Sequence, residues 1–93
     1  MLYREAAALV EDAAAYESRG EYERAAETFI LAASGLESAT DSEPDPKIQQ
    51  LLRIKAREVE SWGVNLYAWL EQGQPGTVPV RRAGSVLVVA ETH

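Results

Sequence analysis

The sequence predicts an all-α domain, a three-helix antiparallel bundle followed by a linker rich in proline and glycine and a short apolar C-terminal tail. Apolar residues recur at helical spacing in three segments, and glycine or proline interrupts the pattern between them. The composition, 46% hydrophobic and 26% charged, is typical of a globular chain. We expect residues 1–72 to form the bundle and residues 73–93 the linker and tail, or the start of a following segment.

The first predicted helix covers about residues 3–19. Its apolar positions recur every three or four residues, as one face of a helix requires; they are Ala6, Leu9, Val10, Ala13 and Tyr16. Gly20 follows, and a glycine in the left-handed conformation ends many helices.

The second predicted helix begins near Tyr22 and runs to about Ala39. Its apolar positions alternate spacings of three and four: Tyr22, Ala25, Phe29, Ala32, Leu36 and Ala39. This near-heptad period favours shallow crossing angles in a bundle. The pattern is then interrupted by the sequence TDSEPDPK, which has two prolines and no apolar residue besides them.

The third predicted helix is the longest and runs to about Gln72. Asp45 and Pro46 are typical of an N-cap followed by proline at the first helical position. The apolar stripe is Ile48, Leu52, Lys55, Val59, Trp62, Leu66 and Trp69, with lysine as its one interruption. Because a buried lysine is rare unless it is paired, we expect the Lys55 ammonium to reach an acid of the first two helices.

The composition changes after this helix. Residues 73–84 include three glycines and two prolines, which indicates a linker. Residues 86–90 are five consecutive apolar residues, too few for a membrane span. They predict an added strand, a docking tail or the start of another domain. At the other end of the chain, the first predicted helix lacks the layout of a signal peptide. We therefore expect a soluble intracellular chain.

Charge is distributed unevenly along the chain. The net charge is −6, with eleven acids against three bases in residues 1–46 and six bases against four acids in residues 47–93. Attraction between the acidic helices and the third helix fits a bundle. The shortage of clustered Lys and Arg argues against nucleic acid as a partner.

No residue set predicts catalysis. The chain has no cysteine, and its single histidine is the terminal His93. Neighbouring acids such as Glu58 and Glu60 point to different faces of a helix and cannot share a proton. We therefore expect no catalytic residues, no cofactor and no metal site.

Residues 20–25 also fit the turn of a tetratricopeptide repeat, with Gly20, Tyr22 and Ala25 in a Gly-x-Tyr-x-x-Ala pattern. The second and third helices are long for a 34-residue repeat, and no second copy of the pattern occurs. A helical scaffold or oligomerisation domain of this type remains an alternative.

The three helices together resemble the MIT (microtubule-interacting and trafficking) domain family. The resemblance covers about residues 6–70 and is carried by Leu9, Val10 and Ala13, by Tyr22, Ala25, Phe29 and Ala32, and by Leu52, Lys55 and Leu66. It implies a protein-binding module that recognises short C-terminal motifs of ESCRT-III-type proteins. It further implies a cytoplasmic, endosome-associated role in endosomal sorting and protein transport, with membranes reached only through partners.

Members of that family use two grooves. The groove between helices 2 and 3 takes a Leu-rich amphipathic helix, and here the resemblance places Ala56, Glu60, Gly63 and Tyr67 beside it. The family has Leu and Ala where this chain has Glu60 and Gly63, and Glu where it has Val64. These departures favour the other groove.

The groove between helices 1 and 3 takes an extended, proline-containing segment in the family. A helical wheel places Leu51, Trp62 and Trp69 on one flank of the third helix, and the resemblance sets them beside Val10 and Ala13. Tryptophans are frequent interface anchors. We hypothesise that this groove binds an extended peptide. Alternatively, the tryptophans complete the core, cover the apolar tail or form a homodimer face.

Overall fold

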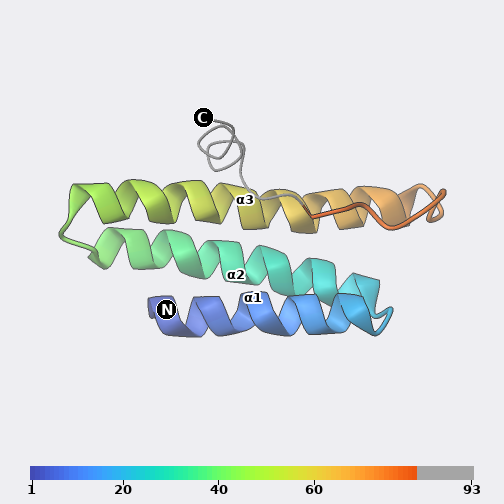
Figure 1. Cartoon of the computed structure of the whole chain (residues 1–93), viewed down its shortest axis with the longest axis horizontal. Coiled ribbons are helices and arrows are strands. Elements are labelled where there is room, and N and C mark those ends of the chain that lie inside the picture. Colours follow the sequence, from blue (N-terminus) through green and yellow to red (C-terminus); the bar gives the residue numbers. More distant parts are fainter. Residues whose placement is uncertain (82–93) are drawn as a thin grey trace, which may run out of the picture.

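The computed structural model describes residues 1–81 and contains three α-helices: α1 (Tyr3–Ser18), α2 (Tyr22–Ser42) and α3 (Pro46–Glu71). Consecutive helices run antiparallel, and α2 lies between α1 and α3 (Figure 1). The described part of the chain has no strand. The predicted all-α three-helix bundle is confirmed.

The turn between α1 and α2 follows from Gly20. This residue has a φ of 78°, in the left-handed region that glycine adopts without a steric penalty. The backbone N–H of Glu21 then donates to the carbonyl of Tyr16 at 2.9 Å, which satisfies one of the last carbonyls of α1. The predicted end of the first helix and start of the second are confirmed.

The end of α2 lies three residues beyond the predicted one. The Thr40 hydroxyl, which is buried, donates to the Leu36 carbonyl at 3.0 Å, so the polar side chain is satisfied within the helix. The helix ends only where Pro44 restricts the residue before it, because Glu43 is extended at φ −88° and ψ 121°.

Asp45 caps α3, as predicted, and its carboxylate accepts the backbone N–H of Lys47 at 2.9 Å. Pro46 occupies the first turn, where its missing N–H costs nothing. Replacing Asp45 with alanine is expected to lower the free energy of unfolding by about 1 kcal/mol. Urea unfolding measures this loss. Asp45→Asn keeps the acceptor and should retain most of the stability, so an equal loss in both variants would contradict the cap.

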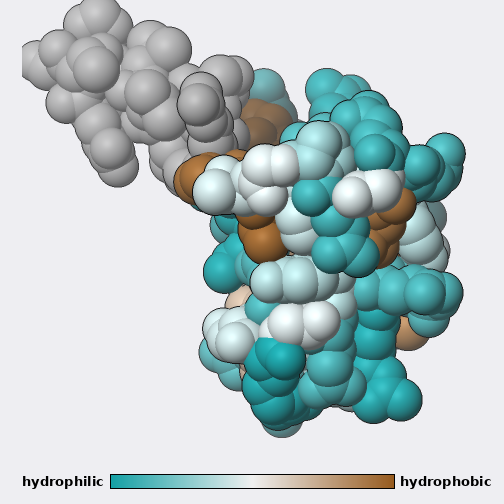
Figure 2. Space-filling model, turned by 90° about the vertical axis from the view of Figure 1, so that its right-hand side faces the viewer, coloured by the Kyte–Doolittle hydropathy of each residue, from teal (hydrophilic) through white to brown (hydrophobic). Residues whose placement is uncertain are grey.

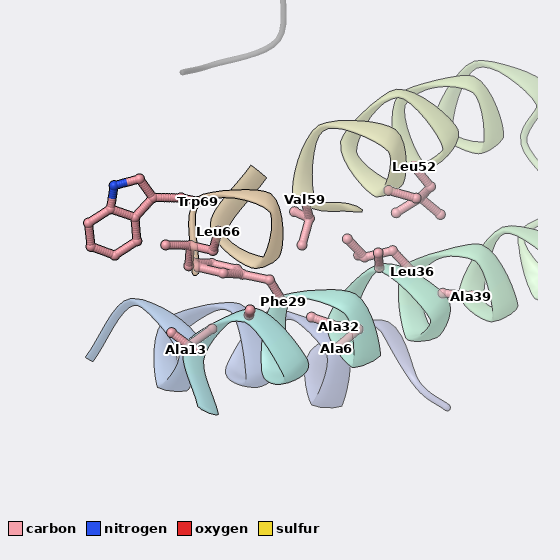
Figure 3. Close-up of a cluster of buried hydrophobic side chains, with 14 residues drawn as sticks. Ala6, Ala13, Phe29, Ala32, Leu36, Ala39, Leu52, Val59, Leu66 and Trp69 are labelled. Carbon is pink, nitrogen blue, oxygen red and sulfur yellow. The ribbon is translucent and has the colours of Figure 1, made fainter. Parts of the chain in front are cut away.

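Alanines and a few larger side chains build the core (Figure 3). The largest fully buried side chains are Phe29 and Leu36 of α2 and Val59 and Leu66 of α3. On α1 the buried residues are Ala6 and Ala13, whose small side chains let α2 approach closely. α2 therefore supplies the centre of the core and packs along both neighbours.

α3 approaches α2 closely at Gly63. A Cβ at this position would lie 2.7 Å from Ile30 Cγ1 and 2.9 Å from the carbonyl oxygen of Ala26. Both distances are shorter than a van der Waals contact, so the packing leaves no room for a side chain. Glycine permits this contact because it has no Cβ.

The predicted apolar stripe of α3 divides between two directions. Leu52, Val59 and Leu66 are buried, as their place in the apolar stripe predicts, whereas Ile48 and Lys55 are exposed. Trp62 is half-buried. An α-helix drifts about 20° per heptad relative to a strict seven-residue repeat, so one row cannot stay buried along 26 residues.

Candidate functional site: the groove between α1 and α3

α1 and α3 both pack along α2 but contact each other little, and a groove lies between them with α2 as its floor. The two outer helices run in the same direction (Figure 1), so their N-terminal ends form one end of the groove. On α3 the groove is lined by a row at helical spacing, Leu51, Lys55, Glu58 and Trp62.

The N-terminal end of the groove is an open apolar pocket of about 660 Å³. Its walls come from residues 1–3, from the end of α2 and from the first turns of α3. Leu2 is 72% exposed and Leu51 is 63% exposed. Tyr3 and Ile48 are exposed as well, so large apolar side chains face each other across a gap that the described residues leave unfilled.

The other end of the groove is occupied by the chain itself. Residues 75–81, which we call the return segment, follow a turn at Gly73 and run back along α3 (Figure 1). The indole N–H of Trp69 donates to the carbonyl of Pro75 at 2.9 Å. Val78 packs against the core. The return segment bends at Gly76 and Thr77, and its residues 78–81 then lie beside α3.

Arg81 joins all three helices at the end of the return segment. Its Nε atom lies 2.6 Å from the Glu17 carboxylate of α1. The guanidinium also lies 5.7 Å from the ring centroid of Phe29 in α2 and 5.8 Å from that of Trp62 in α3. The interaction between a guanidinium and an aromatic ring face is attractive, and it is stronger where water is partly excluded.

Glu58 is a buried carboxylate in the middle of the groove, and the sequence pattern did not indicate it. Its side chain is 4% exposed and accepts a hydrogen bond from Lys55 Nζ at 3.0 Å. The Lys55 side chain is 46% exposed and its ammonium also lies over the Trp62 ring. The prediction that Lys55 pairs with an acid of the first two helices is wrong. The partner one turn along the same helix is closer, and the exposed ammonium keeps its contact with water.

The residues predicted for the helix 1/3 groove lie in different environments. Leu51 lines the open pocket, while Trp62 stands edge-on to Phe29 at 5.6 Å between ring centroids. Trp69 is buried between Tyr22 and the return segment. On α1, Val10 is half-buried and Ala13 is fully buried. Leu51 is therefore the most exposed member of this set.

The residues predicted for the helix 2/3 groove lie mostly within the packed helix pair. Ala56 and Gly63 are buried against α2, and Glu60 is exposed. Tyr67 is half-buried, and burial together with the carboxylates of Glu27 and Glu23 raises the pKa of its phenol. The phenol therefore stays neutral around pH 7, where its ordinary pKa of about 10 already keeps it protonated.

Within residues 1–81, no group of three or more His, Cys, Asp or Glu side chains is placed to hold a metal ion. His93 and the apolar residues 86–90, which the sequence singled out, lie outside the described residues. None of the three helices is long and apolar enough to cross a membrane.

The surface at the far end of the bundle differs from the pocket. Figure 2 views the molecule from the end where the turn at Gly20 and the C-terminal end of α3 lie. That surface is mainly hydrophilic, with hydrophobic residues in small separate areas. The broad apolar surface of the groove is at the opposite end, where α1 and α3 begin.

Comparison of the chain with protein-family models, with curated proteins and with solved structures found no match.

Proposed function

We propose that the chain is a binding module of the MIT type, whose groove between α1 and α3 holds an extended segment of a partner protein. The observation that carries the proposal is the return segment, because a non-helical, proline-containing stretch of this chain packs against the two outer helices. Pro75 and Pro79 fix φ and remove backbone donors, so such a segment loses little entropy on docking. The open pocket extends the same groove beyond it.

The partner proposed from the resemblance is the C-terminal motif of an ESCRT-III-type protein. Binding would bring an activity attached to this chain to cytoplasmic, endosomal sites of membrane remodelling. The apolar walls at Leu2, Ile48 and Leu51 favour a segment with two or three apolar anchors. Catalysis has no part in this proposal.

A matched pair of α3 variants tests the groove. Leu51→Asp places a charge in the pocket and is expected to weaken binding of ESCRT-III C-terminal peptides tenfold or more. Val64→Asp is the control, because Val64 is 52% exposed on the same helix but does not line the groove. Fluorescence anisotropy with labelled peptides measures both affinities. If none of the ESCRT-III C-terminal peptides binds the original chain, or if both variants weaken binding equally, the proposal is wrong.

Self-association is the second candidate function, and the exposed apolar walls of the pocket favour it. A homodimer that buries Tyr3, Ile48 and Leu51 would make this chain a helical scaffold or oligomerisation domain. Sedimentation equilibrium separates the candidates. A dimer that Leu51→Asp dissociates, without peptide binding, supports the scaffold.

A further inference from the structure

The open apolar pocket lies directly ahead of the return segment. Lys55 and Glu58 line both the pocket and the space beside residues 78–81, so the two sites adjoin. The return segment passes Trp69 first and Trp62 last, which means that it runs antiparallel to α3. Its direction at Arg81 is therefore toward the N-terminal end of α3 and toward the pocket.

The chain that follows has the length to reach the pocket. Twelve residues follow Arg81 in the sequence, and the apolar run occupies residues 86–90. Arg81 lies at Trp62, and Leu51 is eleven residues before Trp62 on α3, a distance of roughly 16 Å along the helix axis. Extended chain covers about 3.3 Å per residue, so five residues from Arg81 to Val86 span roughly 16 Å. With this connection extended, residues 86–90 reach the part of the pocket at Leu51 and beyond it.

The chemistry of the run matches the walls. Residues 86–90 are Val, Leu, Val, Val and Ala, with no charge or hydrogen-bonding side chain. The pocket presents Leu2, Ile48, Leu51 and Leu52. Joining them removes apolar surface from water on both sides, and the hydrophobic effect is proportional to that area. Lys55 and Glu58, which also line the pocket, are paired with each other, so an apolar occupant leaves this ion pair intact.

From direction, length and chemistry together, we propose that residues 86–90 dock in the pocket between the N-terminal ends of α1 and α3 of the same chain. The groove is then filled along its length by the C-terminal part of this chain. This docking needs no partner protein and goes beyond the proposed function. A partner segment must displace residues 86–90 before it enters the pocket.

The absence of cysteine makes a cross-linking test direct. The full chain carrying Leu51→Cys and Val88→Cys is expected to form an intramolecular disulfide under mild oxidation, since a disulfide needs Cβ atoms about 3.8 Å apart. The matched control carries Val64→Cys and Val88→Cys, with the first cysteine on an exposed site outside the groove. Mass spectrometry of the monomer should show at least tenfold faster closure of the Leu51 pair. Equal rates, or no closure, overturn the proposal, and a disulfide only between chains assigns the pocket to a second copy.

A second variant tests the docking without cysteines. Val88→Asp changes no side chain of the three helices and is expected to expose the pocket, raising the fluorescence of an apolar dye severalfold at unchanged helical circular dichroism. Unchanged dye binding also overturns the proposal. In the same variant, ESCRT-III C-terminal peptides should bind several times more tightly if the proposed function holds. Cross-linking can succeed while no peptide binds, so failure of the proposed function and failure of this inference are distinguishable.

Discussion

Replacing Phe29 with alanine is expected to lower the free energy of unfolding by about 3–5 kcal/mol. Its ring is fully buried in α2, the middle helix, and meets the Trp62 ring edge-on at 5.6 Å between centroids. The Arg81 guanidinium lies 5.7 Å from the centroid of the Phe29 ring. Truncation therefore leaves a cavity beside Trp62 of α3 and Arg81 of the return segment. Since domains of this size have a total stability of about 5–15 kcal/mol, the loss is a large share.

Urea unfolding followed by far-UV circular dichroism measures the Phe29→Ala effect. Leu31→Ala is the control, because Leu31 is on the same helix and 52% exposed. Its loss is expected to stay below about 1 kcal/mol. Similar losses in the two variants would contradict the placement of Phe29 at the centre of the core.

Gly63→Ala is expected to lower the free energy of unfolding by about 2 kcal/mol, although alanine is the better helix former by about 1 kcal/mol. The new Cβ would stand 2.9 Å from the carbonyl oxygen of Ala26. A backbone atom cannot rotate away, so α2 and α3 must separate at this contact. The loss of packing on both sides outweighs the gain in helix propensity.

Gly35→Ala is the matched control for this substitution. The Cβ at Gly35 would meet the Sδ atom of Met1, the far end of a flexible side chain, and Ala6 Cβ at 3.1 Å. The methionine can move aside and α1 need shift only slightly, so the loss should be smaller than at Gly63. Urea unfolding of both variants provides the comparison. A Gly63→Ala protein as stable as the original would show that the helices are not in contact there.

The helix ends were predictable because they depend on local chemistry. Gly20 and the pair of Asp45 and Pro46 determine a break and a start within a few residues, and the structure confirms both. The end of α2 was misplaced because Thr40 satisfies its own hydroxyl inside the helix, a contact that a polar loop composition does not indicate.

The residues of the groove were harder to assign, because they depend on how a helix is rotated about its axis. Lys55 and Val59 belong to the same predicted stripe, yet one is exposed and the other is buried. A rotation of α3 by some tens of degrees about its axis decides whether a residue of the stripe is exposed or buried. The spacing of apolar residues does not determine that rotation. The contact of Arg81 with Glu17 joins residues that are 64 apart in the sequence, and no local pattern predicts such a pair.

The turn at Gly73 has a consequence for the thermodynamics of the groove. It places residues 75–81 beside the helices at an effective concentration of order millimolar, as short tethers generally do. This concentration belongs to the molecule and does not fall on dilution. A segment from another molecule competes at its bulk concentration, so occupancy of the groove by a partner would depend on how many such segments are gathered in one place. Dense arrays of ligand would then be favoured over single copies of the same affinity.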